Sequence, residues 1–167
     1  MGLKDYFKKR DLKQSKEPAS GKQRHKGFNF CIQKHAARRL HYDLRLEYKG
    51  VLLSWAIPKG PSMNPEDKRL AIHVEDHPLD YQYFEGVIPK GNYGAGVVEI
   101  WDNGTYDVPA DDLEDYVGKG LKKGHFSLIF HGKKLHGEFS FIRINNESKS
   151  EWLLIKKNDL LTLVRNV

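Results

Sequence analysis

The sequence predicts one mainly β domain: a small closed β-barrel of about eight mostly antiparallel strands with one or two short helices. Short segments rich in aromatic and β-branched residues recur from residue 28 onward, and many alternate apolar with polar residues. Glycine-containing turns separate several of these segments. A chain of 167 residues, 39% of them hydrophobic, can form one core and leaves little room for a second.

The strand-like segments can be placed one by one. They are residues 28–33, 43–48, 51–57, 69–75, 96–101, 125–131, 137–144 and 151–157. The turn candidates between them include Lys49-Gly50, Asn103-Gly104 and Gly132-Lys133. The clearest helix covers residues 111–123, where apolar residues follow a helical spacing between an acidic start and a basic end. Residues 3–10 are a weaker helix candidate.

The charge is unevenly placed, because the whole net charge of +6 falls in the first 26 residues. That stretch holds nine Lys and Arg against three Asp and Glu, whereas residues 27–167 hold nineteen of each. We therefore expect a basic mobile N-terminal arm, residues 1–27, followed by the barrel domain, residues 28–167. A basic arm favours a polyanionic partner, although a solvated tail without a partner explains the charge equally well.

Several classes of protein are disfavoured. The chain has no apolar run long enough to cross a membrane and no secretory signal at its start, so we expect a cytoplasmic protein without a membrane partner. The single cysteine, Cys31, excludes an internal disulfide and a cysteine-based zinc cage. The glycines of residues 84–96 lack the spacing of a phosphate-binding loop, and that stretch is interpreted as a structural turn.

The densest chemical signal lies in residues 33–47, QKHAARRLHYDLRLE. A period of two places His41, Asp43 and Arg45 on one face of a strand, opposite an apolar face that should be the core. With His35 returned by a turn, two imidazoles and a carboxylate form the ligand set of an open divalent-metal site. Arg45 could hold a phosphate oxygen bidentately beside the metal. A polar surface face is the usual alternative; with that face turned into a closed barrel, these groups would line a pocket.

A second cluster occupies residues 69–81, RLAIHVEDHPLDY. Pro78 stops the strand, so His77 lies at its end, where a histidine can bind phosphate or transfer protons. Glu75 offers a carboxylate that could orient a histidine ligand. The tripeptide at 76–78 could equally form a turn with a capped aspartate.

These stretches resemble the 3′-phosphoesterase module of bacterial DNA ligase D, which also occurs as free-standing proteins. The matching segments cover nearly the whole chain: QKHAARRLHYDLRLE, LLSWAIPKGPS, KRLAIHVEDHPLDY, FEGVIPKGNYGAGVVEIWDNGTY and WLLIKK. The run His-Ala-Ala-x-x-Leu-His-Tyr-Asp-x-Arg, followed by Asp-His-Pro-x-x-Tyr, makes chance agreement implausible. The resemblance implies a small β-barrel whose hollow centre holds a manganese ion.

The resemblance also implies a role for each matching residue. The metal ligands would be His35, His41 and Asp43, and the scissile phosphate would be held by Arg45 and His77. The residues that would support phosphate and metal binding are Gln33, Lys59, Arg69, Glu75 and Tyr81. The residues that close over the primer end would be Arg10, Asp11 and Glu17.

The activity that the resemblance implies is removal of a 3′-terminal ribonucleoside to leave a 3′-phosphate, then removal of that phosphate to leave a 3′-hydroxyl. Nucleic acid, at a primer-template or single-stranded 3′ end, is the expected partner. Because no polymerase or ligase domain is attached, repair ligase and polymerase proteins are expected as separate partners, and the chain itself as a monomer. Two alternatives stay open: a non-catalytic module that binds nucleic-acid ends, and a cupin-like small-molecule metalloenzyme.

Overall fold

The computed structural model describes residues 2–10, 17–18, 28–145 and 147–158. Within these ranges the chain is mainly β, as the sequence predicts. The elements in chain order are α1 (Lys4–Lys8), β1 (Asn29–Ala36), β2 (Leu40–Tyr48), β3 (Val51–Ile57), β4 (Arg69–His77), the 3₁₀ helix η1 (Leu79–Tyr83), β5 (Gly86–Ile88), β6 (Gly96–Asp107), α2 (Leu113–Lys123), β7 (His125–Gly132), β8 (His136–Arg143) and β9 (Glu151–Lys156). No helix in this part of the chain is long and apolar enough to cross a membrane.

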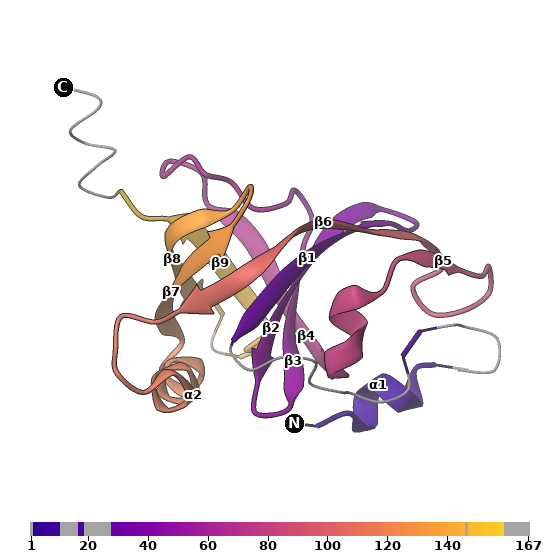
Figure 1. Ribbon diagram of the computed structural model, residues 1–167, viewed down its shortest axis with the longest axis horizontal. Coiled ribbons are helices and arrows are strands. Elements are labelled where there is room, and N and C mark those ends of the chain that lie inside the picture. Colours follow the sequence, from indigo (N-terminus) through magenta and orange to yellow (C-terminus); the bar gives the residue numbers. More distant parts are fainter. Residues whose placement is uncertain (1, 11–16, 19–27, 146, 159–167) are drawn as a thin grey trace.

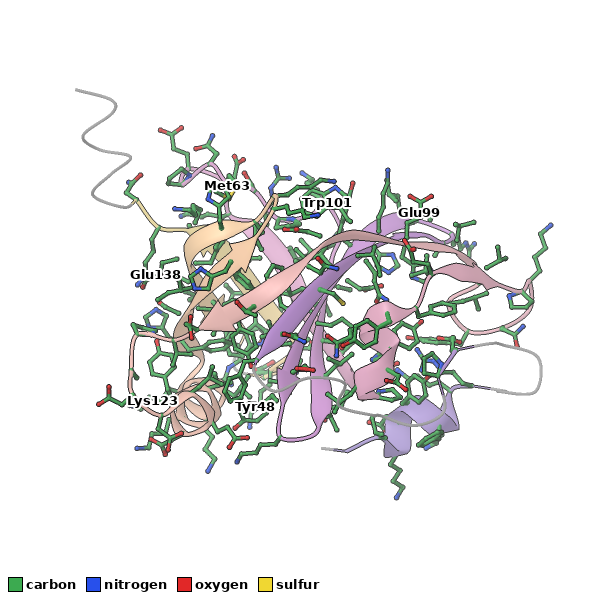
Figure 2. The ribbon with its side chains drawn as sticks, viewed as in Figure 1. Tyr48, Met63, Glu99, Trp101, Lys123 and Glu138 are labelled. Atoms are coloured by element: carbon green, nitrogen blue, oxygen red, sulfur yellow. The ribbon has the colours of Figure 1, made fainter. Side chains whose placement is uncertain are left out.

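Eight antiparallel strands close into the predicted barrel, in the order β1-β2-β3-β4-β9-β8-β7-β6, with β6 pairing back onto β1 (Figure 1). Strand β6 is long enough to pair with two strands besides β1. Its last residues pair with β7 and its first residues pair with the short β5. The register of β1 and β6 shifts between Ile32 and Gln33. Beyond this irregularity β6 continues along β1 and also pairs with β5, and Figure 2 shows Glu99 and Trp101 on its side that faces away from α1.

The barrel interior is filled with apolar side chains. Trp55, Phe126, Phe141 and Trp152 pack together there and are no more than 1% exposed. The alternating residues of each strand must point out of the barrel, and on β1 and β2 these are the predicted site residues. The expectation of a hollow centre that holds the site is therefore wrong. An eight-stranded barrel is just wide enough for its own side chains to fill it.

The outer face of β1–β4 is covered rather than exposed. Tyr6 of α1 is fully buried and packs with Leu52, Leu79 and Tyr81 in a second, smaller hydrophobic cluster. Figure 1 shows α1 and the helical turn that follows β4 on the same side of the barrel. The described residues of the arm thus lie against the barrel, while the division into an arm of residues 1–27 and a domain of residues 28–167 stays a prediction.

The turns of the sequence prediction have mixed outcomes. Lys49 and Gly50 both have positive φ and join β2 to β3, and Gly132 ends β7, as expected. Asn103-Gly104 is not a turn, because both residues lie inside β6. A Cβ on Gly104 would collide with the carbonyl of His131 on the neighbouring strand. The glycine is therefore explained by a close approach of two backbones.

Candidate metal and phosphate site

The β1–β2 hairpin brings the three candidate metal ligands together. His35 and His41 lie directly opposite each other in the antiparallel ladder, and Asp43 follows on the same face. One carboxylate oxygen of Asp43 lies 3.4 Å from His35 Nδ1 and 3.2 Å from His41 Nε2. One ligand atom from each residue falls within 4.8 Å of the others. The predicted turn that returns His35 to the site is confirmed, since β1 ends at Ala36.

The other nitrogen of each imidazole contacts a backbone carbonyl. His35 Nε2 lies 2.6 Å from the Gly94 oxygen, and His41 Nδ1 lies 3.0 Å from the Arg39 oxygen. A carbonyl only accepts hydrogen bonds, so these nitrogens carry the protons and the lone pairs point towards Asp43. Two lone pairs and a carboxylate repel one another unless a cation lies between them. The donor set and its tautomers therefore fit a divalent transition-metal ion.

Asp43 is ionised in this environment. Burial alone raises the pKa of its carboxyl group. Without a metal ion, hydrogen bonds that the imidazoles of His35 and His41 can donate when both ring nitrogens carry protons, together with the positive charge of Arg45, outweigh burial and hold the pKa well below its ordinary value. The carboxylate is thus available as a ligand throughout the physiological pH range.

Arg45 is buried beside this ligand set. Its Nε donates to Gln33 Oε1 at 2.8 Å, one terminal nitrogen donates to Ser54 Oγ at 2.9 Å, and the other lies 3.6 Å from Asp43. A guanidinium has five N–H groups, so one on each terminal nitrogen is left by these three contacts. Because Arg45 also lines the cavity, the two remaining donors are in place for a ligand there.

Gln33 fixes the position of the Arg45 side chain through hydrogen bonds. The Gln33 amide nitrogen donates to the carbonyl oxygens of Tyr81 and Phe84, at 2.7 and 3.1 Å. The same side chain therefore ties Arg45 to the end of η1, and its own burial is complete. This arrangement fixes the guanidinium in one orientation.

A β-bulge in β4 brings in the second cluster. Ser54 pairs with Val74 and Leu52 pairs with His77, so one extra residue lies on β4 between these pairs. The extra residue allows Val74, Glu75 and His77 all to line the cavity. The strand ends at His77, as the following proline predicts.

His77 is a neutral acceptor in this structure. Its Nδ1 lies 2.9 Å from the Glu75 carbonyl oxygen and therefore carries the proton, while Nε2 lies 3.1 Å from a terminal nitrogen of Arg10. Burial and the neighbouring charges of Arg45 and Arg10 lower the pKa of His77 well below its ordinary value. The imidazole therefore brings no positive charge of its own to the cavity.

The arm completes the cavity through Arg10 and Glu17. Arg10 Nε donates to Glu17 at 2.9 Å and a terminal nitrogen donates to Glu75 at 3.2 Å. The Tyr81 hydroxyl donates to Glu17 at 2.7 Å. These ion pairs and hydrogen bonds thus join residues of the arm, β4 and η1 on the outer face of the barrel. Asp11, the third predicted arm residue, lies outside the described residues.

Most predicted site residues meet in this one cavity of about 240 Å³. The predicted site residues that line it are Arg10, Glu17, His35, His41, Asp43, Arg45, Glu75, His77 and Tyr81. Lys59 is exposed and Arg69 pairs with Asp67 at 3.5 Å, and neither lines the cavity, so their roles stay predictions.

Sequence reasoning missed part of the cavity wall. Ile88, Tyr93 and Gly94 come from the stretch that was interpreted as a structural turn. That stretch contains β5 and a loop that reaches the candidate metal ligand His35. The only available signal was its concentration of glycines, which does not distinguish a site loop from any other turn.

Comparison with known proteins places the chain in a family. The model of the DNA ligase D 3′-phosphoesterase domain matches residues 33–143. The multifunctional non-homologous end joining protein LigD of Pseudomonas aeruginosa is 50% identical over 161 residues, which cover 94% of this chain and 19% of that protein. The proteins of the same name from Mycobacterium bovis and Mycolicibacterium smegmatis are 47% and 40% identical, over 76% and 94% of this chain and 16% and 21% of their own lengths.

The chain thus spans about a fifth of the length of the relatives that it matches. The family model covers more than half of the chain and includes the three candidate metal ligands, Arg45 and His77. With the fold, the cavity and these matches in agreement, the chain belongs to the DNA ligase D 3′-phosphoesterase domain family.

Proposed function

We propose that this protein is a metal-dependent phosphoesterase that processes nucleic-acid 3′ ends in DNA repair. It removes a 3′-terminal ribonucleoside and then the remaining 3′-phosphate, which leaves a 3′-hydroxyl. One observation carries the proposal: a His–His–Asp ligand set and a buried arginine with unused donors share one cavity. The names of the relatives, which describe end-joining proteins, support the repair role.

The charges around the cavity support a metal and a phosphate together. The charged described residues that line the cavity are Arg10, Arg45, Glu17, Asp43 and Glu75. With Lys9, which pairs with Glu75 from outside the lining, cations and carboxylates are equal in number. A divalent ion alone would leave an excess of positive charge in a poorly solvated space. A phosphate dianion beside the ion restores the balance.

His35, His41 and Asp43 would hold the ion, and we propose manganese or a similar transition ion. Imidazole is a poor ligand for magnesium, which prefers oxygen ligands and retains its water. When bound, such an ion polarises the phosphoryl oxygens.

Arg45 would bind two phosphate oxygens with its remaining donors, one on each terminal nitrogen. This forked geometry matches a phosphate, and water is largely excluded from the buried site, so the interaction strengthens as charge develops in the transition state. Gln33 and Ser54 act as positioning residues, because they hold Arg45 without lining the cavity themselves.

His77 would act as a neutral acceptor. Because the imidazole brings no charge, the positive charge near the phosphate comes from Arg45 and Arg10. His77 Nε2 accepts from Arg10 and so orients it, and this lone pair would accept a proton from an attacking group only after Arg10 has moved to the phosphate. Roles for Asp11, Lys59 and Arg69 in closing over the primer end and supporting the phosphate rest on the resemblance alone.

The proposal is tested with a 5′-labelled DNA primer that ends in one ribonucleotide, incubated with Mn²⁺ and resolved on a gel. We expect a 3′-phosphate product to form first and a 3′-hydroxyl product to follow, and Asp43→Asn to form neither. A wild-type protein that binds the primer without converting it would be an end-binding module. One that neither binds nor converts it would point to a small-molecule substrate instead.

A further inference from the structure

Tyr93 is a large aromatic residue at the edge of the cavity to which the proposed mechanism gives no role. Its side chain is 50% exposed, yet it lines the cavity next to Gly94. It belongs to residues 89–95, the loop between β5 and β6. A half-exposed ring beside a candidate phosphate site offers a flat apolar surface to the organic group attached to that phosphate.

The loop holds the Tyr93 ring in a fixed place relative to the metal ligands. The Gly94 carbonyl oxygen lies 2.6 Å from His35 Nε2. Within the loop, the amide of Asn92 donates to the Pro89 carbonyl at 3.2 Å, and the amide of Ala95 donates to the Asn92 carbonyl at 3.1 Å. The backbone that carries the ring is therefore pre-positioned for a ligand.

The arm reaches the same ring from the other side of the cavity. Lys9 Nζ lies 5.0 Å from the Tyr93 ring centroid, and the Arg10 guanidinium carbon lies 5.4 Å from it. Both cations also bind Glu75 on β4. The arm and the loop thus bridge the cavity at this point. A continuing strand would have to displace this bridge, whereas a terminal nucleoside would not extend beyond it.

The β1–β2 turn lies beside the second candidate ligand, His41. Arg38 and Arg39 are both exposed there, and the Arg39 carbonyl contacts the metal ligand His41. Exposed arginines suit the phosphates of an incoming strand. An upstream strand would find cationic partners at this turn, and a terminal nucleoside would find an aromatic partner in Tyr93.

We infer that Tyr93 stacks on the nucleobase of the 3′-terminal nucleoside that the enzyme removes; this inference rests on the proposed function. Stacking on an aromatic ring tolerates every base, so it selects for the presence of a nucleoside and not for its sequence. The 3′-phosphate left by the first step has lost that nucleoside. Tyr93 therefore contributes to ribonucleoside removal and not to phosphate removal.

The test compares both reactions in wild type, Tyr93→Ala, Tyr93→Phe and the control Val87→Ala, an exposed β5 residue outside the cavity lining. Tyr93→Ala should lose about tenfold in kcat/KM for ribonucleoside removal, within the range for loss of one base–aromatic stack, and less than twofold for 3′-phosphate removal. Tyr93→Phe and Val87→Ala should match wild type. On a primer that ends in an abasic ribose, kcat/KM of the wild type should fall by the same factor. Tyr93→Ala should show no further loss on that primer.

A second measurement is independent of turnover. A primer whose terminal nucleoside is 5-iodouridine is irradiated with the protein in the absence of added metal, and the cross-linked peptide is identified by mass spectrometry. We expect the cross-link on Tyr93, and a cross-link elsewhere would overturn the inference. Equal losses of both reactions in Tyr93→Ala would also overturn it, because Tyr93 would then only anchor the arm. Failure of the proposed function is distinct: wild type would convert neither primer.

Discussion

The rings of His35 and His41 face each other across the β1–β2 ladder with centroids 4.7 Å apart, and both reach the same oxygen of Asp43. The two histidines come from neighbouring strands, so the geometry of the ligand set depends on the register of the hairpin. A slip of one residue would turn the β2 ligands to the opposite face of the sheet. The packing of the barrel interior therefore also fixes the position of the metal ligands outside it.

His41→Ala should lower the affinity for Mn²⁺ by more than about a hundredfold, because loss of a direct ligand should cost at least as much as loss of a residue that orients one. Both phosphoesterase activities should disappear with it. Calorimetric titration with Mn²⁺ measures the affinity. The control is His125→Ala, an exposed histidine of β7, which should leave the affinity unchanged. A folded His41→Ala protein with full affinity would exclude this ligand set.

Manganese should support activity far better than magnesium, since two of the three ligands are imidazoles. The measurement is turnover of the ribonucleotide-ended primer by protein stripped with a chelator and then supplied with one metal at a time. Equal turnover with magnesium alone would contradict a histidine-coordinated ion.

Asp76→Asn should stabilise the protein at neutral pH but not at low pH. The Asp76 side chain is 2% exposed, one of its oxygens has no hydrogen-bond partner, and burial and the nearby Asp5 and Glu75 raise its pKa from 3.8 to about 6. Because the folded state binds the proton more tightly than the unfolded state, ionised Asp76 costs stability as the pH rises from about 4 to about 6.

The measurement for Asp76→Asn is the difference in Tm between variant and wild type at several pH values. The difference should increase by about 5–10 °C between pH 4 and pH 7, because a pKa raised from 3.8 to about 6 corresponds to roughly 2–3 kcal/mol in the free energy of unfolding. Taking the difference cancels every titration that the two proteins share. A difference that stays constant with pH would show that Asp76 has an ordinary pKa.

Tyr6→Ala should detach the arm from the barrel. Tyr6 is fully buried, its hydroxyl donates to the Pro18 carbonyl, and the Arg10 guanidinium lies 4.1 Å from its ring centroid. Loss of a buried aromatic side chain should cost about 3 kcal/mol in the free energy of unfolding. Activity should fall because Arg10 leaves the cavity, while affinity for Mn²⁺ stays unchanged.

The control for Tyr6→Ala is Phe7→Ala, because Phe7 is the neighbouring residue of α1 and is 44% exposed. It should change stability and activity little. If Tyr6→Ala retained full activity, docking of the arm would be irrelevant to the reaction, and Arg10 would not belong to the site.

The strand pattern could be predicted from the sequence because each barrel strand packs one face against the interior. Period-two alternation correctly separated His41, Asp43 and Arg45 from the apolar residues between them. Alternation cannot tell which face points into a barrel. In this protein the apolar side chains fill the interior, so the polar face lies outside and needs a cover from α1 and η1.

Two local irregularities could not be predicted from the alternation of apolar and polar residues. The β4 bulge places Val74 and Glu75 on the same side, although simple alternation assigns them to opposite faces. The short strand β5 has only three residues, too few for a periodic signal. The contribution of Tyr93 to the cavity depends on where that short strand pairs with β6, which is a tertiary contact.

The most direct test of a phosphate-binding Arg45 is Arg45→Lys, with turnover, Mn²⁺ content and Tm measured on the same preparation. Lysine keeps the charge but cannot form the fork or retain the contacts to Gln33 and Ser54 together. The account predicts retained metal and fold, with activity reduced on the order of a hundredfold, as when one transition-state donor is removed. Turnover near wild type, or a loss that merely follows a fall in Tm, would contradict it.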